Sequence, residues 1–265
     1  MAIQRSAQRV QLEAELGEPF RALAKYFRGA TAAPHPRDRQ FWNALHASDL
    51  EAALAALAPA PDAAADEAYL DEIAFAFARI VDAKSSFTRG HSARVADYAL
   101  AIADGLGLEP GHRRWIRRAA LLHDIGKLGV ATAILDKPGK LSRAEMAAMR
   151  EHAALGEYVL SEVPVFADLA AVVGAHHERL DGRGYPRGLA GEAICLETRI
   201  ISAADAFDAM TADRPYSPAV TRTVALARMT DEIGSCFDAG CVAALAAADV
   251  VPTTADGPAR AGSAA

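Results

Sequence analysis

The sequence predicts an all-α protein, in which a helical bundle follows a small helical N-terminal region. Alanine is abundant while valine, isoleucine and aromatic residues are modest in number, a composition that favours helices over sheets. Apolar residues recur at helical spacing along most of the chain, and no segment shows the alternation that marks paired strands. A chain of 265 residues has room for one sizeable core with a small accessory region, or for two modest domains.

Residues 1–60 make up the N-terminal region, with expected helices at Val10–Phe27 and Arg39–Leu57. This region contains no chemical motif, and a helical cap or dimerisation element is its simplest interpretation. A ligand-sensing or partner-docking region is the alternative. The stretch APAPDAAAD around Pro59–Asp66 indicates a linker, which we place at residues 61–68.

The helical pattern then continues through a core domain at residues 69–250, followed by a disordered tail at residues 251–265. Gly107 is a plausible C-cap, and Pro110 sits where the first turn of a helix tolerates proline. The expected core helices are Tyr69–Lys84, Arg89–Leu106, Gly111–Ile125, Arg143–Glu162, Val165–Glu178, Glu197–Ala212, Arg222–Ile233 and Ala239–Ala247.

Charge and composition exclude several classes of protein. The net charge of −6 argues against binding a nucleic-acid polymer, although a local basic pocket could still hold phosphates. No apolar run approaches the roughly 18 residues of a membrane span, and the start of the chain lacks a signal-peptide pattern. The three cysteines show no metal-ligand spacing, so reduced thiols in the cytoplasm are the simplest interpretation.

The segment LLHDIGKLG, Leu121–Gly129, carries the first chemical signal. His123 and Asp124 follow a buried apolar turn, and an imidazole beside a carboxylate offers two ligand types for a borderline divalent metal. A carboxylate also bridges two metals, which an imidazole ordinarily does not. An HD dipeptide alone is weak, but here Lys127 and the histidine of GHSARVA, His91, accompany it.

The segment HHERLDGRGYPRGLAG, His176–Gly191, is the rarer signal. His176 and His177 end an apolar helix and point about 100° apart, so they can reach one metal centre from adjacent directions. The glycines and Pro186 that follow predict a long ordered loop.

Five segments in this order closely resemble HD-GYP domains, over roughly Tyr69 to Ala248: GHSARVA, LLHDIGKLGV, ILDKPGKLS, HHERLDGRGYPRGLAG and DAFDAMTADRPYS. The resemblance implies a helical HD-superfamily fold and a site for two or three metals, with iron or manganese the usual ions. It also implies hydrolysis of cyclic di-GMP to the linear dinucleotide, to GMP, or to both.

Site residues are carried over from the same resemblance. Asp124 matches the position that bridges two metals. Asp208 is not part of that match; from its place three residues after Asp205, it is expected to support the site or stabilise the helix without binding metal. Lys127 and Arg214 match positions that contact the substrate, with Arg183 as a further candidate; Lys127 also counts as a catalytic residue with Asp124. The implied metal ligands are His91, His123, Asp124, His152, His176, His177 and Asp205.

Two positions depart from the family pattern. Three-metal members carry a glutamate where this chain has Phe87, which predicts two divalent ions, iron or manganese, per chain. Family members often have a basic residue where this chain has Ser217, so one phosphate contact is missing.

The leading hypothesis is therefore a cytoplasmic phosphodiesterase that hydrolyses cyclic di-GMP. A second hypothesis keeps the chemistry but changes the substrate to another cyclic dinucleotide or a nucleotide, as Ser217 favours. A third hypothesis is a slow regulatory module that docks partners, such as diguanylate cyclase domains, through the GYP loop. The complete ligand set argues against this third hypothesis. A homodimer is left open.

Overall fold

The computed structural model describes residues 67–85, 90–212 and 218–250. The predicted N-terminal helical region at 1–60 and the predicted disordered tail at 251–265 lie outside them. The described residues fall into two compact units, the smaller formed by 67–73 with Tyr158–Ala170 and the larger by the remainder. Every described candidate site residue belongs to the larger unit.

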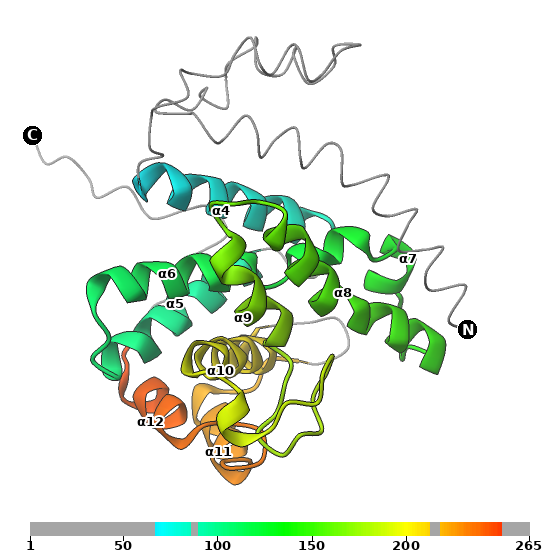
Figure 1. The fold of residues 1–265 in the computed structure, drawn as a ribbon. Coiled ribbons are helices and arrows are strands. Elements are labelled where there is room, and N and C mark those ends of the chain that lie inside the picture. Colours follow the sequence, from blue (N-terminus) through cyan, green and yellow to red (C-terminus); the bar gives the residue numbers. More distant parts are fainter. Residues whose placement is uncertain (1–66, 86–89, 213–217, 251–265) are drawn as a thin grey trace, which may run out of the picture. The chain divides into compact units, whose positions relative to one another are not determined.

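The regular structure of the described residues is helical, as predicted, and within them the only strand-like pairings are isolated bridges (Figure 1). The α-helices are α4 (Glu67–Ala83), α5 (His91–Gly105), α6 (Pro110–Leu122), α7 (Thr132–Leu135), α8 (Arg143–Ser161), α9 (Ala170–Ala175), α10 (Leu196–Thr211), α11 (Arg222–Asp231) and α12 (Ala239–Ala247). The 3-10 turns are η1 (Ile125–Gly129), η2 (Ala167–Leu169) and η3 (Gly191–Ala193).

Most helix boundaries agree with the sequence, and α12 agrees at both ends. Helix α4 begins at Glu67, so the last two residues of the predicted linker at 61–68 are helical. The single helix expected at Val165–Glu178 is wrong, since a 3-10 turn at Ala167–Leu169 precedes a short α9. Phe166, with φ −126° and ψ 3°, lies outside the helical region of backbone space, so a continuous helix cannot pass through it.

Helix α5 is the centre of the larger unit and packs against α6, α10 and α12 (Figure 1). Its apolar face is fully buried at Val95 and Ile102. Tyr98 meets Phe207 of α10 edge to face, with ring centroids 4.9 Å apart. This packing fixes α5 against α10, the two helices that carry the first and last of the predicted metal ligands.

A glycine sets how closely the turn after α6 approaches α8. A Cβ atom on Gly126 would lie 1.9 Å from the carbonyl oxygen of His152 and 2.6 Å from the backbone nitrogen of Gly156. Only glycine allows this approach, and it brings the segment after His123 against the middle of α8.

Within the residues that the structure describes, none of the helices combines the length and the hydropathy that a membrane span requires.

Candidate metal centre

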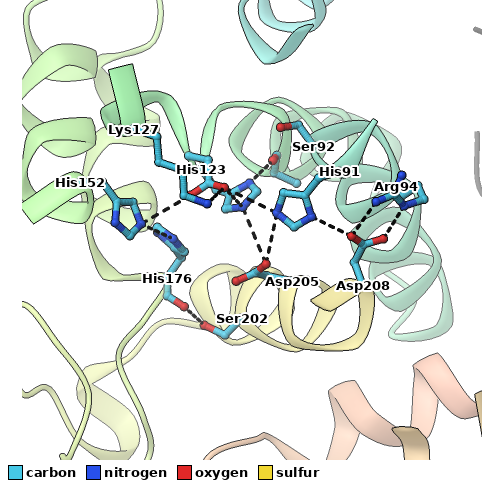
Figure 2. A network of polar contacts seen from close by, with 12 residues as sticks. His91, Ser92, Arg94, His123, Lys127, His152, His176, Ser202, Asp205 and Asp208 are labelled. Carbon is cyan, nitrogen blue, oxygen red and sulfur yellow. Dashed lines mark hydrogen bonds and ion pairs between the residues drawn. The ribbon is translucent and has the colours of Figure 1, made fainter. Parts of the chain in front are cut away.

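The predicted metal ligands converge on one buried cluster in the larger unit (Figure 2). Their donor atoms form overlapping groups in which the ligand atoms lie within 4.8 Å of one another. His91 opens α5, His123 and Asp124 follow the end of α6, His152 lies in α8, His176 and His177 follow α9, and Asp205 lies in α10. The structure thus brings together all seven residues that the resemblance assigned as ligands.

The backbone orients three of the imidazole rings. The Nδ1 atoms of His123, His152 and His176 each donate to the carbonyl oxygen three residues earlier, at 2.7, 2.7 and 2.5 Å. In the neutral ring this places the only proton on Nδ1 and leaves a lone pair on Nε2. Each ring therefore presents Nε2 to the cluster as a metal ligand.

In the neutral rings, the Nε2 lone pairs of His123 and His152 face other acceptor atoms, a carboxylate oxygen and an imidazole nitrogen. His123 Nε2 is buried and has no hydrogen-bond partner. His152 Nε2 lies 3.4 Å from His176 Nε2, so two lone pairs face each other when both rings carry their proton on Nδ1. Buried polar atoms without partners are costly, and a divalent cation among these atoms removes the cost. The residues therefore fit the metals that the fold family implies.

Asp124 lies between two sets of histidines. Its Oδ2 atom is 3.5 Å from His91 Nε2 and 3.3 Å from His123 Nε2, while its Oδ1 atom is 3.5 Å from His152 Nε2. We call His91, His123 and Asp205 the first ligand group, and His152, His176 and His177 the second ligand group. The Asp124 carboxylate presents one oxygen to each group, which is the arrangement of a bridging ligand.

Several carboxylates surround the histidines of the first ligand group and raise their pKa values. Burial alone would lower the pKa of His91, but hydrogen bonds with the surrounding carboxylates, that of Asp124 first, hold the pKa well above its usual value. The same balance between burial and the Asp124 carboxylate raises the pKa of His123. Burial would raise the pKa of Asp124, yet the charges of Lys127 and His123 hold it well below its usual value.

In the second ligand group, the pKa values of the histidines are lowered instead of raised. Burial lowers the pKa of His152. Burial and the neighbouring imidazoles together lower the pKa of His176 strongly, and burial lowers that of His177 to about 4. These three rings therefore favour the neutral form, which is the form that binds metal.

An outer carboxylate orients His91. Asp208 Oδ2 lies 2.7 Å from His91 Nδ1, and Arg94 holds the same carboxylate with two bonds of 2.6 and 3.0 Å. Figure 2 shows these contacts running from His91 through Asp208 to Arg94. Such a carboxylate fixes the ring tautomer and strengthens the ligand. The sequence predicted a supporting role for Asp208 but missed Arg94, although its position three residues after His91 on one helical face was a usable signal.

The predicted substrate-contacting residues have different positions. Lys127 stands at the cluster, with Nζ 2.5 Å from Asp124 Oδ2. Arg183 is exposed, and the contact described for it joins its backbone N–H to Asp181, so the structure does not bring its side chain to the cluster. Arg214 lies outside the described residues, as do the departures at Phe87 and Ser217.

The loop after His177 is folded tightly against the site. A Cβ atom on Gly184 would lie 2.5 Å from both the backbone nitrogen of Arg179 and the Cα atom of Glu178, so glycine is required at that position. The fold places Tyr185 against His177, with ring centroids 4.8 Å apart and planes 31° apart. From the sequence, Tyr185 was predicted only to belong to the loop, and the spacing of the loop residues did not indicate this contact.

Glu178 closes the same loop from inside. Its side chain is buried and accepts hydrogen bonds from three consecutive backbone N–H groups, those of Arg187, Gly188 and Leu189, at 2.7, 3.1 and 2.9 Å. No role for Glu178 was predicted from the sequence, although a glutamate directly after two ligand histidines and before a glycine-rich loop is a visible signal. The expectation that the loop docks partner proteins stays a prediction.

Comparison with known families settles what kind of domain carries this cluster. The model of the HD domain family matches residues 76–240, well over half of the chain. The chain belongs to the HD domain family. The HD-GYP resemblance predicted from the motifs is confirmed, and the matched range contains every residue of the two ligand groups.

Two relatives of this HD domain protein are named as phosphodiesterases. It is 51% identical over 207 residues to "3'3'-cGAMP-specific phosphodiesterase 3" of Vibrio cholerae, covering 78% of this chain and 45% of the relative. It is 42% identical over 170 residues to "Cyclic di-GMP phosphodiesterase response regulator RpfG" of Xanthomonas campestris, covering 63% of this chain and 45% of the relative. The chain thus spans slightly less than half the length of these relatives.

A solved structure shares the fold at lower identity. The HDG"Y"P protein from Bdellovibrio bacteriovorus is 20% identical, with a TM-score of 0.50, over 68% of this chain and 63% of that chain.

Proposed function

We propose that this HD domain protein is a metal-dependent phosphodiesterase that hydrolyses a cyclic dinucleotide. The observation that carries the proposal is the Asp124 carboxylate, which presents one oxygen to each of two ligand groups. Two divalent ions held there would supply Lewis acidity toward a phosphodiester and lower the pKa of an attacking water. The imidazole-rich ligand set favours a transition metal over magnesium or calcium, and the family resemblance implies iron or manganese.

The side chains around the cluster have separate roles in this proposal. Lys127, one fifth exposed and beside Asp124, neutralises charge on the phosphate or on the leaving oxygen. Asp208 and Arg94 keep the His91 ring turned toward the cluster. Arg214 supplies a planar, bidentate phosphate contact, as the family resemblance implies.

The substrate is proposed from the names of the relatives. The relative with the higher identity and coverage is named for 3'3'-cGAMP, and the other for cyclic di-GMP. We therefore place 3'3'-cGAMP beside cyclic di-GMP, the substrate that the motifs alone suggested, and rank it first. Both molecules hold two phosphodiesters in one ring, so the same metal chemistry serves either.

Purified protein tests the proposal directly. The chain is loaded anaerobically with Fe(II) or Mn(II) and incubated with 3'3'-cGAMP, cyclic di-GMP and cyclic di-AMP, and the products are separated by chromatography. Linear dinucleotides or mononucleotides are expected from at least one of the first two substrates. Intact substrates in every incubation, at a confirmed metal content, would overturn the proposal. Metal analysis of the same samples checks the expected two ions per chain.

A further inference from the structure

Arg150 stands beside the site and is unlike the cations within it. It lies on α8, two residues before the ligand His152, and its side chain is exposed. Its guanidinium carbon lies 4.9 Å from the centroid of the Tyr185 ring. Tyr185 in turn lies against His177, so one phenol ring contacts both an exposed guanidinium and a ligand imidazole of the cluster.

The other cations described at the site are already paired with carboxylates. Lys127 is paired with Asp124, and Arg94 is paired with Asp208. Among the residues that the structure describes, Arg150 has the Tyr185 ring beside it and no carboxylate within ion-pair distance. Its hydrogen-bond donors are therefore available to an anion from solution.

The Tyr185 phenol connects Arg150 electrostatically to the cluster. Burial and the carboxylates of Asp124 and Asp205 raise the pKa of Tyr185, while the charge of Arg150 lowers it. The phenol thus lies within electrostatic range of the metal-binding carboxylates and of the guanidinium. An anionic ligand that extends from the cluster past Tyr185 would reach Arg150.

We propose that Arg150 binds the phosphodiester that is not cleaved and so helps to select cyclic dinucleotides over simple diesters. The proposal rests on the proposed function, because it requires a substrate with two phosphates. One phosphate lies at the ligand groups, and the second, held in the same ring, needs a cation at a distance from them. A guanidinium suits this role because its planar fork donates two hydrogen bonds to one phosphate.

Two substrates separate this role from simple support of Tyr185. Kinetics are measured for the wild type, Arg150→Gln and Arg150→Lys on the preferred cyclic dinucleotide and on bis(p-nitrophenyl) phosphate, which has a single phosphodiester. Arg228→Gln, on exposed Arg228 of α11, is the matched control. Circular dichroism and metal content are compared for all the proteins, so that a folding or loading defect is recognised.

We expect Arg150→Gln to raise KM for the cyclic dinucleotide roughly 10- to 100-fold, the effect of one lost charge-assisted contact, with kcat nearly unchanged. Hydrolysis of bis(p-nitrophenyl) phosphate should not change, Arg150→Lys should recover part of the loss, and Arg228→Gln should behave as wild type. An equal loss on both substrates, or no loss on either, would overturn the proposal. Failure of the proposed function is separate, because it shows in the wild type as an inability to cleave any cyclic dinucleotide.

Discussion

At the scale of single residues, the chemistry depends on which atom of each side chain is free. The backbone carbonyl three residues earlier accepts a hydrogen bond from Nδ1 of His123, of His152 and of His176. This local contact is available because each histidine has a helical turn before it, and the side chain points back over that turn. The consequence is a set of Nε2 atoms aimed at Asp124.

Replacing Asp124 with alanine should remove most bound metal and abolish hydrolysis, because this carboxylate faces both ligand groups. The fold should persist, since Leu121 and Leu122 bury the apolar end of α6 independently of the metals. Metal analysis, circular dichroism and product chromatography check this together. Asp231→Asn, on exposed Asp231 of α11, is the control. Near-normal metal content and activity in Asp124→Ala would show that the carboxylate is no bridge.

The two ligand groups should differ in the protons that they release when metal binds. The pKa of His91 is raised well above its usual value and that of His123 is raised, so these rings favour the protonated form more than a free imidazole does, and metal binding must displace any proton they hold. The rings of the second ligand group have lowered pKa values, that of His177 about 4, and bind without proton release. Metal affinity of the first group should therefore rise as pH rises through neutrality.

Calorimetry in two buffers of different ionisation enthalpy measures this proton release at pH 7. The release should fall in His91→Ala and persist in His177→Ala, because only the first of these rings is protonated before metal binds. Equal release from both variants would contradict the assignment of charge to the two groups.

At the scale of elements, the long helices carry only some of the ligands. Short irregular segments position the others. The turn η1 follows His123 and Asp124 and approaches α8 through Gly126, and the loop after α9 folds back on His177 through Gly184. Both approaches depend on glycine because a Cβ atom would collide with backbone. The helices provide rigidity, and these turns bring the ligand pairs into contact.

Replacing Glu178 with glutamine should loosen the loop that follows the ligand pair. Three backbone N–H groups donate hydrogen bonds to its carboxylate and would lose a charged acceptor. The glutamine amide would also place its N–H₂ group, itself a donor, against one of these donors. Hydrogen bonds to charged groups are worth about 1.5–3 kcal/mol each, and we expect a loss of about 1–3 kcal/mol in the free energy of unfolding. Urea denaturation measures this loss.

Hydrogen exchange locates the effect of the same change. The amides of Arg187, Gly188 and Leu189 should exchange faster in Glu178→Gln, and hydrolysis should slow as Tyr185 and His177 lose their fixed places. Glu192→Gln is a control, since Glu192 is almost fully exposed in its ion pair with Arg199. Unchanged exchange at these three amides would show that Glu178 does not hold the loop.

At the scale of the whole molecule, the site draws its ligands from segments far apart in the chain. His91 and Asp205 lie more than a hundred residues apart yet meet with Nε2 and Oδ1 3.4 Å from each other. The unfolded chain cannot hold these ligands together, so metal binding and folding of this unit are coupled.

Metal should therefore stabilise the folded chain, with a gain that grows with the logarithm of the free metal concentration once the site is nearly saturated. At a free Mn(II) concentration a hundred times Kd, the free energy of unfolding should rise by about 2.7 kcal/mol for one site. Urea denaturation of chelator-treated protein, with and without added Mn(II), measures the gain. The gain should be much smaller in Asp124→Ala, and an equal gain there would show that the stabilising metal binds elsewhere.

Much of this protein could be predicted from its sequence because the determining signals are local. Helical periodicity predicted α12 at both ends and α4, α5, α8 and α10 to within two residues, since a buried stripe must recur every three or four positions. The seven ligands could be named because the family motifs carry them, whereas the residue pattern alone pointed to His123 with Asp124 and to His176 with His177. The family motifs then distinguished His152 from an ordinary surface histidine.

Only the tertiary structure decided the features that arise between distant segments. The division of the histidines into two ligand groups of opposite pKa shift depends on where three carboxylates lie around His91. Periodicity does not report backbone angles, so it missed the break before α9. It also does not report contacts between separate segments, such as those of Glu178 with the loop and of Arg150 with Tyr185. Residue types and their spacing determine which side chains can act on a phosphate, whereas packing determines which atoms face one another and hence the charge of the site.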